Sequence, residues 1–177
     1  MKGTQGIGVV ELLIVIVVLA ILTGITASGF QGTLDRRQAE GEAQDLWSAL
    51  NRARTEAIMR DTRVTLCPVN DAGQCDADAS WEDGWRMFED PMAQGYPAED
   101  AAWIDGRGAS TVDIRPNTPV DAYVSYTSRG VPRRLTGALQ MGSFRICGEA
   151  VAYRLVMTSV GRVRLEEIAE CPLADPG

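Results

Sequence analysis

The 177-residue sequence predicts an α+β protein in which one long N-terminal helix packs against a mainly antiparallel β-sheet. Three observations predict this fold class. An apolar run, 7–25, comes first, and the following segment, 31–60, has the periodicity of an amphipathic helix. From residue 61 to residue 177 the pattern changes to short alternating segments separated by turn residues. We therefore expect a helical stem followed by a β-rich head.

The apolar run is a candidate membrane span. As a helix, residues 7–30 are long enough to cross the hydrocarbon layer, and Glu11 is their only charge. A secretory signal peptide would account for Lys2 and for a cleavage site near residues 26–28. An ordinary membrane anchor would account for the length. Neither accounts for Glu11, because a carboxylate at membrane depth costs about 2.5–3.5 kcal/mol.

The residues around Glu11 resemble the leader of type IV prepilins. Gly6 ends a leader of residues 1–6, Ile7 follows it, and Glu11 is the fifth residue after Gly6. The resemblance implies that a prepilin peptidase cuts after Gly6 and that Ile7 is then N-methylated. It also implies that Glu11 acts in subunit assembly, where its carboxylate lies near the terminal amine of a neighbouring subunit.

The same resemblance implies a location. The protein would span the bacterial inner membrane once, with its N-terminus in the cytoplasm and its head in the periplasm. It would then enter a filament on the cell surface. Many major pilins have a proline late in the membrane helix, where this chain has Gly24, Ser28 and Gly29. The sequence therefore leaves open whether the stem helix melts in a filament.

Residues 31–60 are expected to form the amphipathic half of the stem. Leu46, Leu50, Ala53 and Ala57 recur at helical spacing and are expected to pack on the sheet. The other face carries the charged residues Asp35, Arg36, Arg37, Glu40, Glu42 and Asp45. A separate soluble helix joined to the apolar run by a loop is the alternative interpretation.

The head has strand and turn signals throughout, except in one long segment. We expect a loop over 90–108, which is rich in glycine, proline and acidic residues. The expected strands are 63–67, 85–88, 110–114, 122–127, 139–147, 151–158 and 162–166.

Several head segments resemble the GspH/FimT family of minor pilins and pseudopilins. They are residues 50–58, the W-x-x-G-W pattern of Trp81–Trp85, and the C-terminal segments 144–147 and 159–165. The resemblance implies the type IV pilin fold. It also implies assembly with other major and minor pilins or pseudopilins.

The four cysteines favour disulfide bonds, because an even number beyond a membrane segment is typical of an oxidising compartment. A four-cysteine zinc site is the alternative, although no C-x-x-C pair is present. Three disulfide pairings are possible. The family resemblance implies Cys67–Cys75 and Cys147–Cys171.

The composition argues against an enzyme. The chain has no histidine, which removes the commonest general base and zinc ligand. The acidic pairs Glu82-Asp83 and Glu89-Asp90 have no metal-ligand spacing beside them, and we interpret them as solvated loop acids or a weak calcium site. We expect no catalytic residue, no metal and no cofactor.

The net charge of −7 hides two opposed regions. Residues 71–105 contain ten acids and one base, whereas residues 129–165 contain seven arginines and one acid. Within the second region, 161–164 resembles the G-R-x-R motif of DNA-binding FimT proteins. In a strand, Arg162 and Arg164 would share one face and could contact DNA phosphates. The candidates for binding double-stranded DNA are Gly161, Arg162, Arg164, Arg154, Arg145, Arg133 and Arg134.

Three functions remain open at this stage. The first is a minor pilin that helps to initiate or cap a type IV pilus, and the second adds DNA capture for natural transformation. The third is a GspH-like pseudopilin of a type II secretion system. The alternative to DNA binding is that the arginines form a plain solvated face or pair with Glu166, Glu167 and Glu170.

Overall fold

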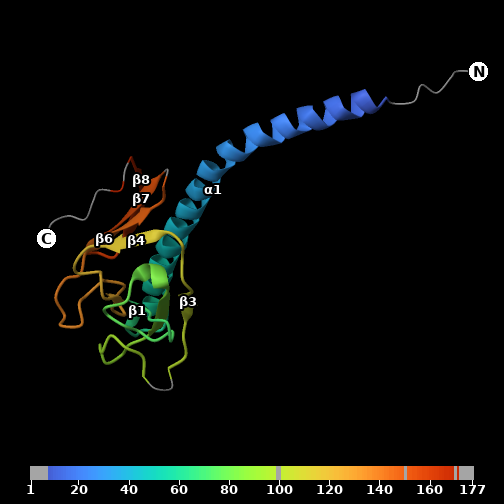
Figure 1. Cartoon of the computed structure of the whole chain (residues 1–177). Helices are drawn as coiled ribbons and strands as arrows, with labels where there is room; N and C mark the ends of the chain where they lie inside the picture. Colours follow the sequence, from blue (N-terminus) through green and yellow to red (C-terminus); the bar gives the residue numbers. More distant parts are fainter. Residues whose placement is uncertain (1–7, 99–100, 150, 170, 172–177) are drawn as a thin grey trace, which may run out of the picture.

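A computed structural model describes residues 8–98, 101–149, 151–169 and 171, except for the side chains of 21–31. The expected leader, its cleavage site and Glu170 lie outside these residues. One long helix, α1 (Val9–Met59), leads into a head that contains two antiparallel sheets (Figure 1). The α+β prediction is confirmed.

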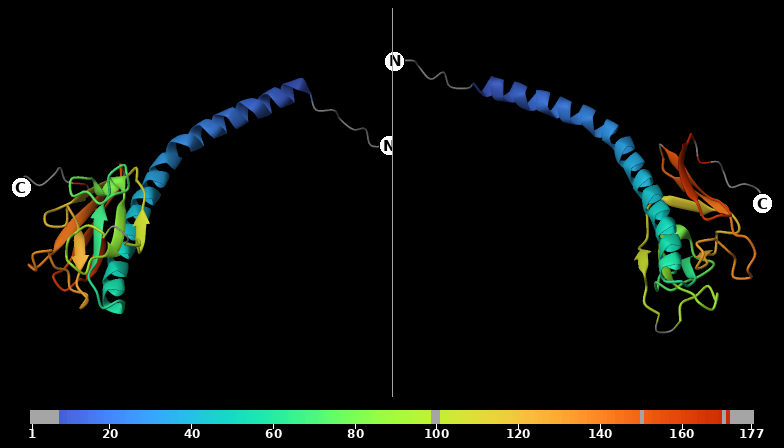
Figure 2. Two further views of the ribbon diagram at one scale, coloured as in Figure 1. Left: turned by 90° about the horizontal axis from the view of Figure 1, so that it is seen from below. Right: turned by 180° about the vertical axis from the view of Figure 1, so that it is seen from behind.

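Helix α1 is one continuous element, so the alternative of two helices joined by a loop is wrong. It remains helical through Gly24, Ser28 and Gly29. It curves along its length, and its N-terminal half projects from the head (Figure 2). At its other end, Asp61 adopts a φ of 48° and the Thr62 amide donates to the Ala57 carbonyl at 3.2 Å, which closes the final turn.

The first sheet lies beside the C-terminal half of α1. Its strands are β1 (Val64–Pro68), β2 (Trp85–Glu89), β3 (Asp105–Arg107) and β5 (Val124–Tyr126), in the order β3-β2-β1-β5. A short 3-10 helix, η1 (Trp81–Asp83), precedes β2. Strand β3 falls inside the segment 90–108, which the sequence predicted to be a loop throughout.

The second sheet is built from the C-terminal half of the head. Its strands are β4 (Asp113–Pro116), β6 (Gly142–Cys147), β7 (Ala152–Met157) and β8 (Val163–Ile168), in the order β4-β6-β7-β8. All pairs in both sheets are antiparallel. The prediction of one sheet is therefore wrong.

A buried side chain explains why the two sheets stay separate. Gln140, which is fully buried, accepts a hydrogen bond from the Ser125 amide at 3.0 Å. Its amide nitrogen donates to the carbonyls of Pro119 and Tyr123 at 3.0 and 2.8 Å. Gln140 thus satisfies backbone groups of the β5 segment that a further strand would otherwise pair with.

The core lies between α1 and both sheets. On the helix, the buried stripe consists of Ala39, Ala43, Leu46, Ala49, Leu50, Ala53 and Ala57. Tyr126 of β5 links the two sheets, because its hydroxyl donates to the sulfur of Met157 in β7 at 3.3 Å. Burial raises the pKa of Tyr126. The buried stripe confirms the predicted packing face of the stem.

Ion pairs attach the edge of the first sheet to the helix. Arg107 of β3 pairs with Glu42 at 2.5 Å and with Asp45. Glu42 is only 5% exposed, so its expected place on the solvated face is wrong. Gly84 lets β3 approach, since a Cβ there would lie 2.5 Å from the Arg107 carbonyl oxygen.

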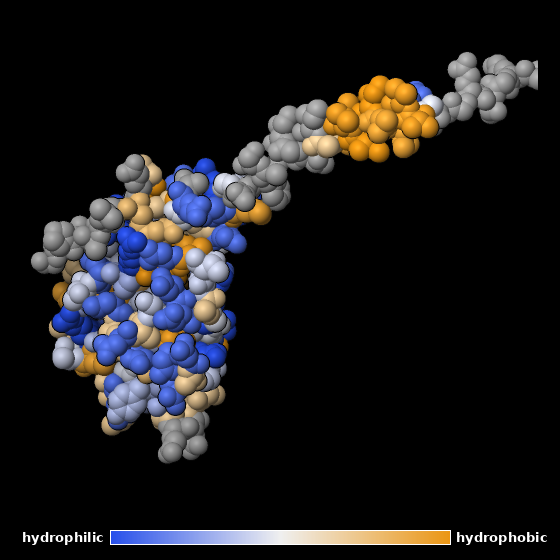
Figure 3. All heavy atoms as spheres, in the orientation of Figure 1, coloured by the Kyte–Doolittle hydropathy of each residue, from blue (hydrophilic) through white to orange (hydrophobic). Residues whose placement is uncertain are grey.

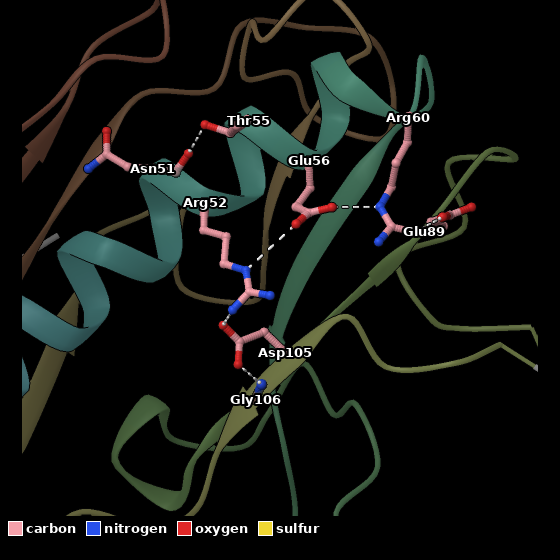
Figure 4. Close-up of polar contacts among 8 residues, drawn as sticks. All are labelled: Asn51, Arg52, Thr55, Glu56, Arg60, Glu89, Asp105 and Gly106. Atoms are coloured by element: carbon pink, nitrogen blue, oxygen red, sulfur yellow. Dashed lines mark hydrogen bonds and ion pairs between the residues drawn. The ribbon is translucent and has the colours of Figure 1, made fainter.

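A second group of ion pairs continues toward the end of the helix (Figure 4). Arg52 pairs with Asp105 at 3.0 Å, and Arg60 contacts Glu56 and Glu89 at 2.6 Å each. The hydrogen bond from Arg60 holds the pKa of Glu56 below its ordinary value of 4.5. These contacts join β2 and β3 to the last turns of α1.

The cysteines pair as the family resemblance implied. One disulfide joins Cys67 in β1 to Cys75 in the following loop, with 5.5 Å between the Cα atoms. The other joins Cys147, at the end of β6, to Cys171. The second bond attaches the C-terminal segment to the second sheet.

Asp90 is buried rather than a solvated loop acid. It is 3% exposed and accepts hydrogen bonds from the Thr65 hydroxyl at 3.0 Å and from the amides of Gln94 and Gly95 at 2.7 and 3.0 Å. The Thr65 hydroxyl also contacts the Ser125 hydroxyl at 2.8 Å. Asp90 therefore organises the loop that leaves β2.

We predict that Asp90→Ala lowers the free energy of unfolding by about 2–3 kcal/mol, because three buried or part-buried donors lose a charged acceptor. Urea unfolding of the full-length protein, followed by tryptophan fluorescence, measures the change. Asp71→Ala is the matched control, since Asp71 is exposed and forms no hydrogen bond within the described residues. Equal midpoints for the two variants would contradict this prediction.

Candidate functional site

The projecting half of α1 is a candidate assembly surface. Its apolar side chains from Val9 to Leu19 are each 48–77% exposed. Figure 3 shows this apolar segment standing clear of the head, whose visible face is largely polar. Glu11 lies in the first turn, where the amide groups of a helix N-terminus favour a negative charge.

The predicted membrane span covers residues 7–30. Among the residues that the structure describes, no helix combines the length and the hydropathy needed to cross a membrane. The span therefore stays a prediction. The apolar surface that the structure does describe is the exposed segment from Val9 to Leu19, on which no part of the described head packs.

Three of the predicted DNA-binding arginines share the outer face of the second sheet. Arg145, Arg154 and Arg164 lie on β6, β7 and β8, and Arg145 is directly opposite Arg154 in the strand register. Arg154 pairs with Glu166 at 3.3 Å. For Arg154, the alternative from the sequence analysis is therefore correct: a nearby glutamate neutralises its charge.

Side-chain alternation in β8 follows the prediction. Val163 is buried and Leu165 packs against the core, whereas Arg162 and Arg164 are exposed. Neither arginine forms an ion pair with any residue that the structure describes. This outer face also contains a broad depression of about 780 Å³ that Arg154, Arg164 and Glu166 help to line.

Gly161 has a packing role in the turn between β7 and β8. Its φ is 80°, and a Cβ there would lie 2.5 Å from the Gly130 carbonyl oxygen. The same carbonyl accepts a hydrogen bond from Arg54 of α1 at 3.0 Å. The glycine thus lets the turn that carries Arg162 pack on the 127–131 turn.

Arg133 and Arg134 belong to a different place from the sheet-face arginines. They lie on the segment 127–139, which covers the outer edge of β5 through the bridge between Tyr126 and Pro132 and the hydrogen bond from the Arg133 amide to the Ser125 carbonyl at 2.9 Å. The predicted arginine candidates therefore form two groups, one on the outer face of the second sheet and one beside the edge of the first.

Sequence reasoning missed one arginine of this second group. Arg63 lines the same depression as Arg129 and Arg133, although it is more than 60 residues away in the sequence. In the sequence, Arg63 was visible only as the first residue of a predicted strand, 63–67. The antiparallel pairing of β1 with β5 brings it to this place.

The acids of 71–105 do not form one acidic surface. Glu89 and Asp105 pair with arginines of the helix, and Asp90 is buried. Glu82 accepts a hydrogen bond from the Ile114 amide at 3.3 Å. Within the described residues, no three histidine, cysteine or acidic side chains gather as a metal site would require.

The chain matches the family model described as type II transport protein GspH over residues 42–161, which is 120 of its 177 residues. No curated protein matches the chain in sequence. The fold is similar to that of the type IV minor pilin FimU of Pseudomonas aeruginosa PAO1 in two crystal forms. The TM-scores are 0.55 and 0.57 at 19% identity, covering 75% and 77% of this chain and 99% and 97% of FimU.

A weaker similarity, with a TM-score of 0.48 and 14% identity, links the chain to the minor pseudopilin EpsH of the Vibrio cholerae type 2 secretion system. It covers 73% of this chain and 97% of EpsH. The family match spans more than half of the sequence, and the FimU similarity supports the same fold. The chain therefore belongs to the GspH family, and it is a pilin-like structural subunit rather than an enzyme.

Proposed function

We propose that the protein is a minor pilin of a type IV pilus that helps to initiate or cap filament assembly. The observation that carries the proposal is the exposed apolar segment of α1, with Glu11 as its single charge. Such a surface requires a cover, because large exposed apolar patches are unfavourable in water. The inner membrane covers it before assembly, and the helices of neighbouring subunits cover it within the filament.

The head supports this role through its rigid attachment to the stem. Both sheets pack on the C-terminal half of α1, and ion pairs from Glu42, Arg52 and Arg60 fix the edge of the first sheet. A force or a contact at the head is therefore transmitted to the helix. This coupling suits a subunit that must dock the helix and the head together.

A pseudopilin of a type II secretion system is the second candidate, and the family description itself favours it. Deletion of the gene separates the two. Loss of surface filaments with normal protein secretion supports the minor pilin. Loss of secretion with normal filaments supports the pseudopilin.

We predict cleavage between Gly6 and Ile7, followed by N-methylation of Ile7. The glycine, the following apolar residue and Glu11 have the register of a prepilin leader. Intact-mass analysis of protein extracted from membranes measures the N-terminus. A mature N-terminus after Ser28, or an uncut Met1, would rule out the pilin assignment.

We predict that the Glu11→Ala protein still inserts into the membrane, but that the amount incorporated into filaments falls at least roughly fivefold. Loss of a charge-assisted contact worth about 1 kcal/mol or more shifts the incorporation equilibrium by that factor. Removing the acid lowers the cost of insertion but leaves the neighbouring amine unpaired. Immunoblots of sheared filaments and of membranes compare the two pools. Glu40→Ala, which makes the same change farther along α1, should incorporate normally.

DNA binding is an additional proposed role of the outer face of the second sheet. It is supported by the exposure of Arg162 and Arg164 and by the absence of an ion pair between either arginine and the described residues. Arginines on a strand face contact phosphates rather than base edges, so binding would be independent of sequence. The pairing of Arg154 with Glu166 reduces the contribution of that arginine.

We predict that the detergent-solubilised full-length protein binds double-stranded DNA weakly and loses affinity as salt rises. Arg162→Ala with Arg164→Ala should lower the slope of log affinity against log salt by roughly 2, which is about one unit per lost phosphate contact. Fluorescence anisotropy at several salt concentrations measures both slopes. Arg37→Ala removes a charge on α1 and should leave the slope unchanged, whereas Arg36 is kept because it pairs with Glu167 of β8 at 3.0 Å. If the wild type does not bind at low salt, the DNA role fails and the assembly role stands alone.

A further inference from the structure

We propose that a depression beside the 127–137 segment is a binding site for a phosphate group, held by Arg63, Arg129 and Arg133. The depression has a volume of about 510 Å³ and is open to solvent. Its lining also includes Thr127, Val131 and Gly137, and no acidic residue. The site is separate from the outer face of the second sheet, and it rests on neither the assembly role nor the DNA role.

Two of the three guanidinium groups are oriented in advance. One nitrogen of Arg63, Nη1, donates to the Ser125 hydroxyl at 3.0 Å and to the Arg133 carbonyl at 3.2 Å. The Nη1 atom of Arg133 donates to the Gly137 carbonyl at 3.4 Å. Within the described residues, the other guanidinium nitrogens of both arginines have no hydrogen-bond partner. They are therefore available to an anion in the depression.

The backbone beneath these side chains is fixed by hydrogen bonds. The Thr127 amide and hydroxyl both donate to the Val131 carbonyl at 3.0 Å. The Arg133 amide donates to the Ser125 carbonyl at 2.9 Å. Arg63 immediately precedes β1, which pairs with β5. An anion would therefore meet arginines whose spacing is set before it binds, which lowers the entropic cost of binding.

The positive charge of the depression is largely uncompensated. None of Arg63, Arg129 and Arg133 forms an ion pair with a described carboxylate. The Asp90 amide donates to the Arg63 carbonyl at 2.8 Å, and the Asp90 side chain is linked to the Arg63 guanidinium through the hydroxyls of Thr65 and Ser125. The carboxylate of Asp90 accepts three hydrogen bonds from other groups and forms no ion pair with the three arginines. A bound anion would relieve the mutual repulsion of the three arginines.

The number of arginines favours phosphate over a carboxylate. Each guanidinium offers a planar pair of donors that matches two oxygen atoms. A carboxylate has two oxygens and a single charge, and one bidentate arginine contact engages both oxygens. A phosphate group has more oxygens and up to about twice the charge, so it can engage all three arginines at once. The phosphate can be free inorganic phosphate or a group on a nucleic-acid backbone, and the test separates these sources.

The test uses the full-length protein in a non-ionic detergent and a phosphate-free buffer at low salt. Isothermal titration calorimetry with inorganic phosphate should give one saturable site. Arg129→Gln should weaken this binding by roughly tenfold or more, since it removes charge-assisted hydrogen bonds. Arg129 is exposed and its side chain bonds no described residue, so its substitution leaves the head folded. Arg37→Gln makes the same charge change on α1, outside the depression, and should leave phosphate affinity unchanged.

Acetate and a short DNA duplex complete the experiment. Acetate should bind at least roughly tenfold more weakly than phosphate, because it cannot occupy three arginines. If Arg129→Gln also weakens duplex binding, nucleic-acid phosphates enter the site; if it weakens only phosphate binding, the ligand is the free anion. Absence of saturable phosphate binding, equal losses in Arg129→Gln and Arg37→Gln, or equal binding of acetate would overturn the proposal.

Discussion

One face of helix α1 has to provide the core for two sheets at once. The buried stripe on this face is rich in alanine, and its small side chains let strands approach the helix closely. These alanines are Ala39, Ala43, Ala53 and Ala57. Leu46 and Leu50 supply apolar volume between them. The two sheets do not continue into one another, so they hold their relative position mainly through this shared helix face and through the contact between Tyr126 and Met157. Loss of the stripe would separate the sheets as well as the helix.

Ion pairs engage several acidic residues near the helix and the first sheet, and so help to determine which charges face outward. Arg107 pairs with Glu42 and Asp45, while Arg52 and Arg60 take up Asp105 and Glu89. Apart from the pair with the buried Glu42, these pairs are largely exposed, and exposed pairs contribute little stability individually, typically below about 1 kcal/mol. Their larger effect is positional, because they attach a three-residue edge strand to the stem. Acids engaged in this way do not neutralise the arginines of the C-terminal half.

The helix and the head expose different kinds of surface. No part of the described chain covers the apolar N-terminal half of α1. A membrane, or neighbouring subunits in a filament, would cover these exposed side chains. The C-terminal half of the same helix packs one face against the head, while side chains such as Ile58 and Met59 stay exposed. The arginines in the C-terminal part of the head lie on two separate surfaces, one on the outer face of the second sheet and one beside the 127–137 segment. These surfaces are available for ligands while the projecting helix is engaged elsewhere.

The sequence alone determined the local features, since helical periodicity and strand alternation depend on neighbouring residues. It predicted the continuous stem with its Leu46–Ala57 stripe, the alternation of Arg162 to Leu165, and the approximate positions of the described strands except β3. Tertiary structure decided what depends on distant contacts. Gln140 satisfies backbone groups beside β5, so the two sheets stay separate. The ion pairs of Arg107 attach the edge strand β3 to α1. The pairing of β1 with β5 places Arg63 beside Arg133. Such arrangements arise from hydrogen bonds and charges between residues far apart in the sequence, so no local pattern specifies them.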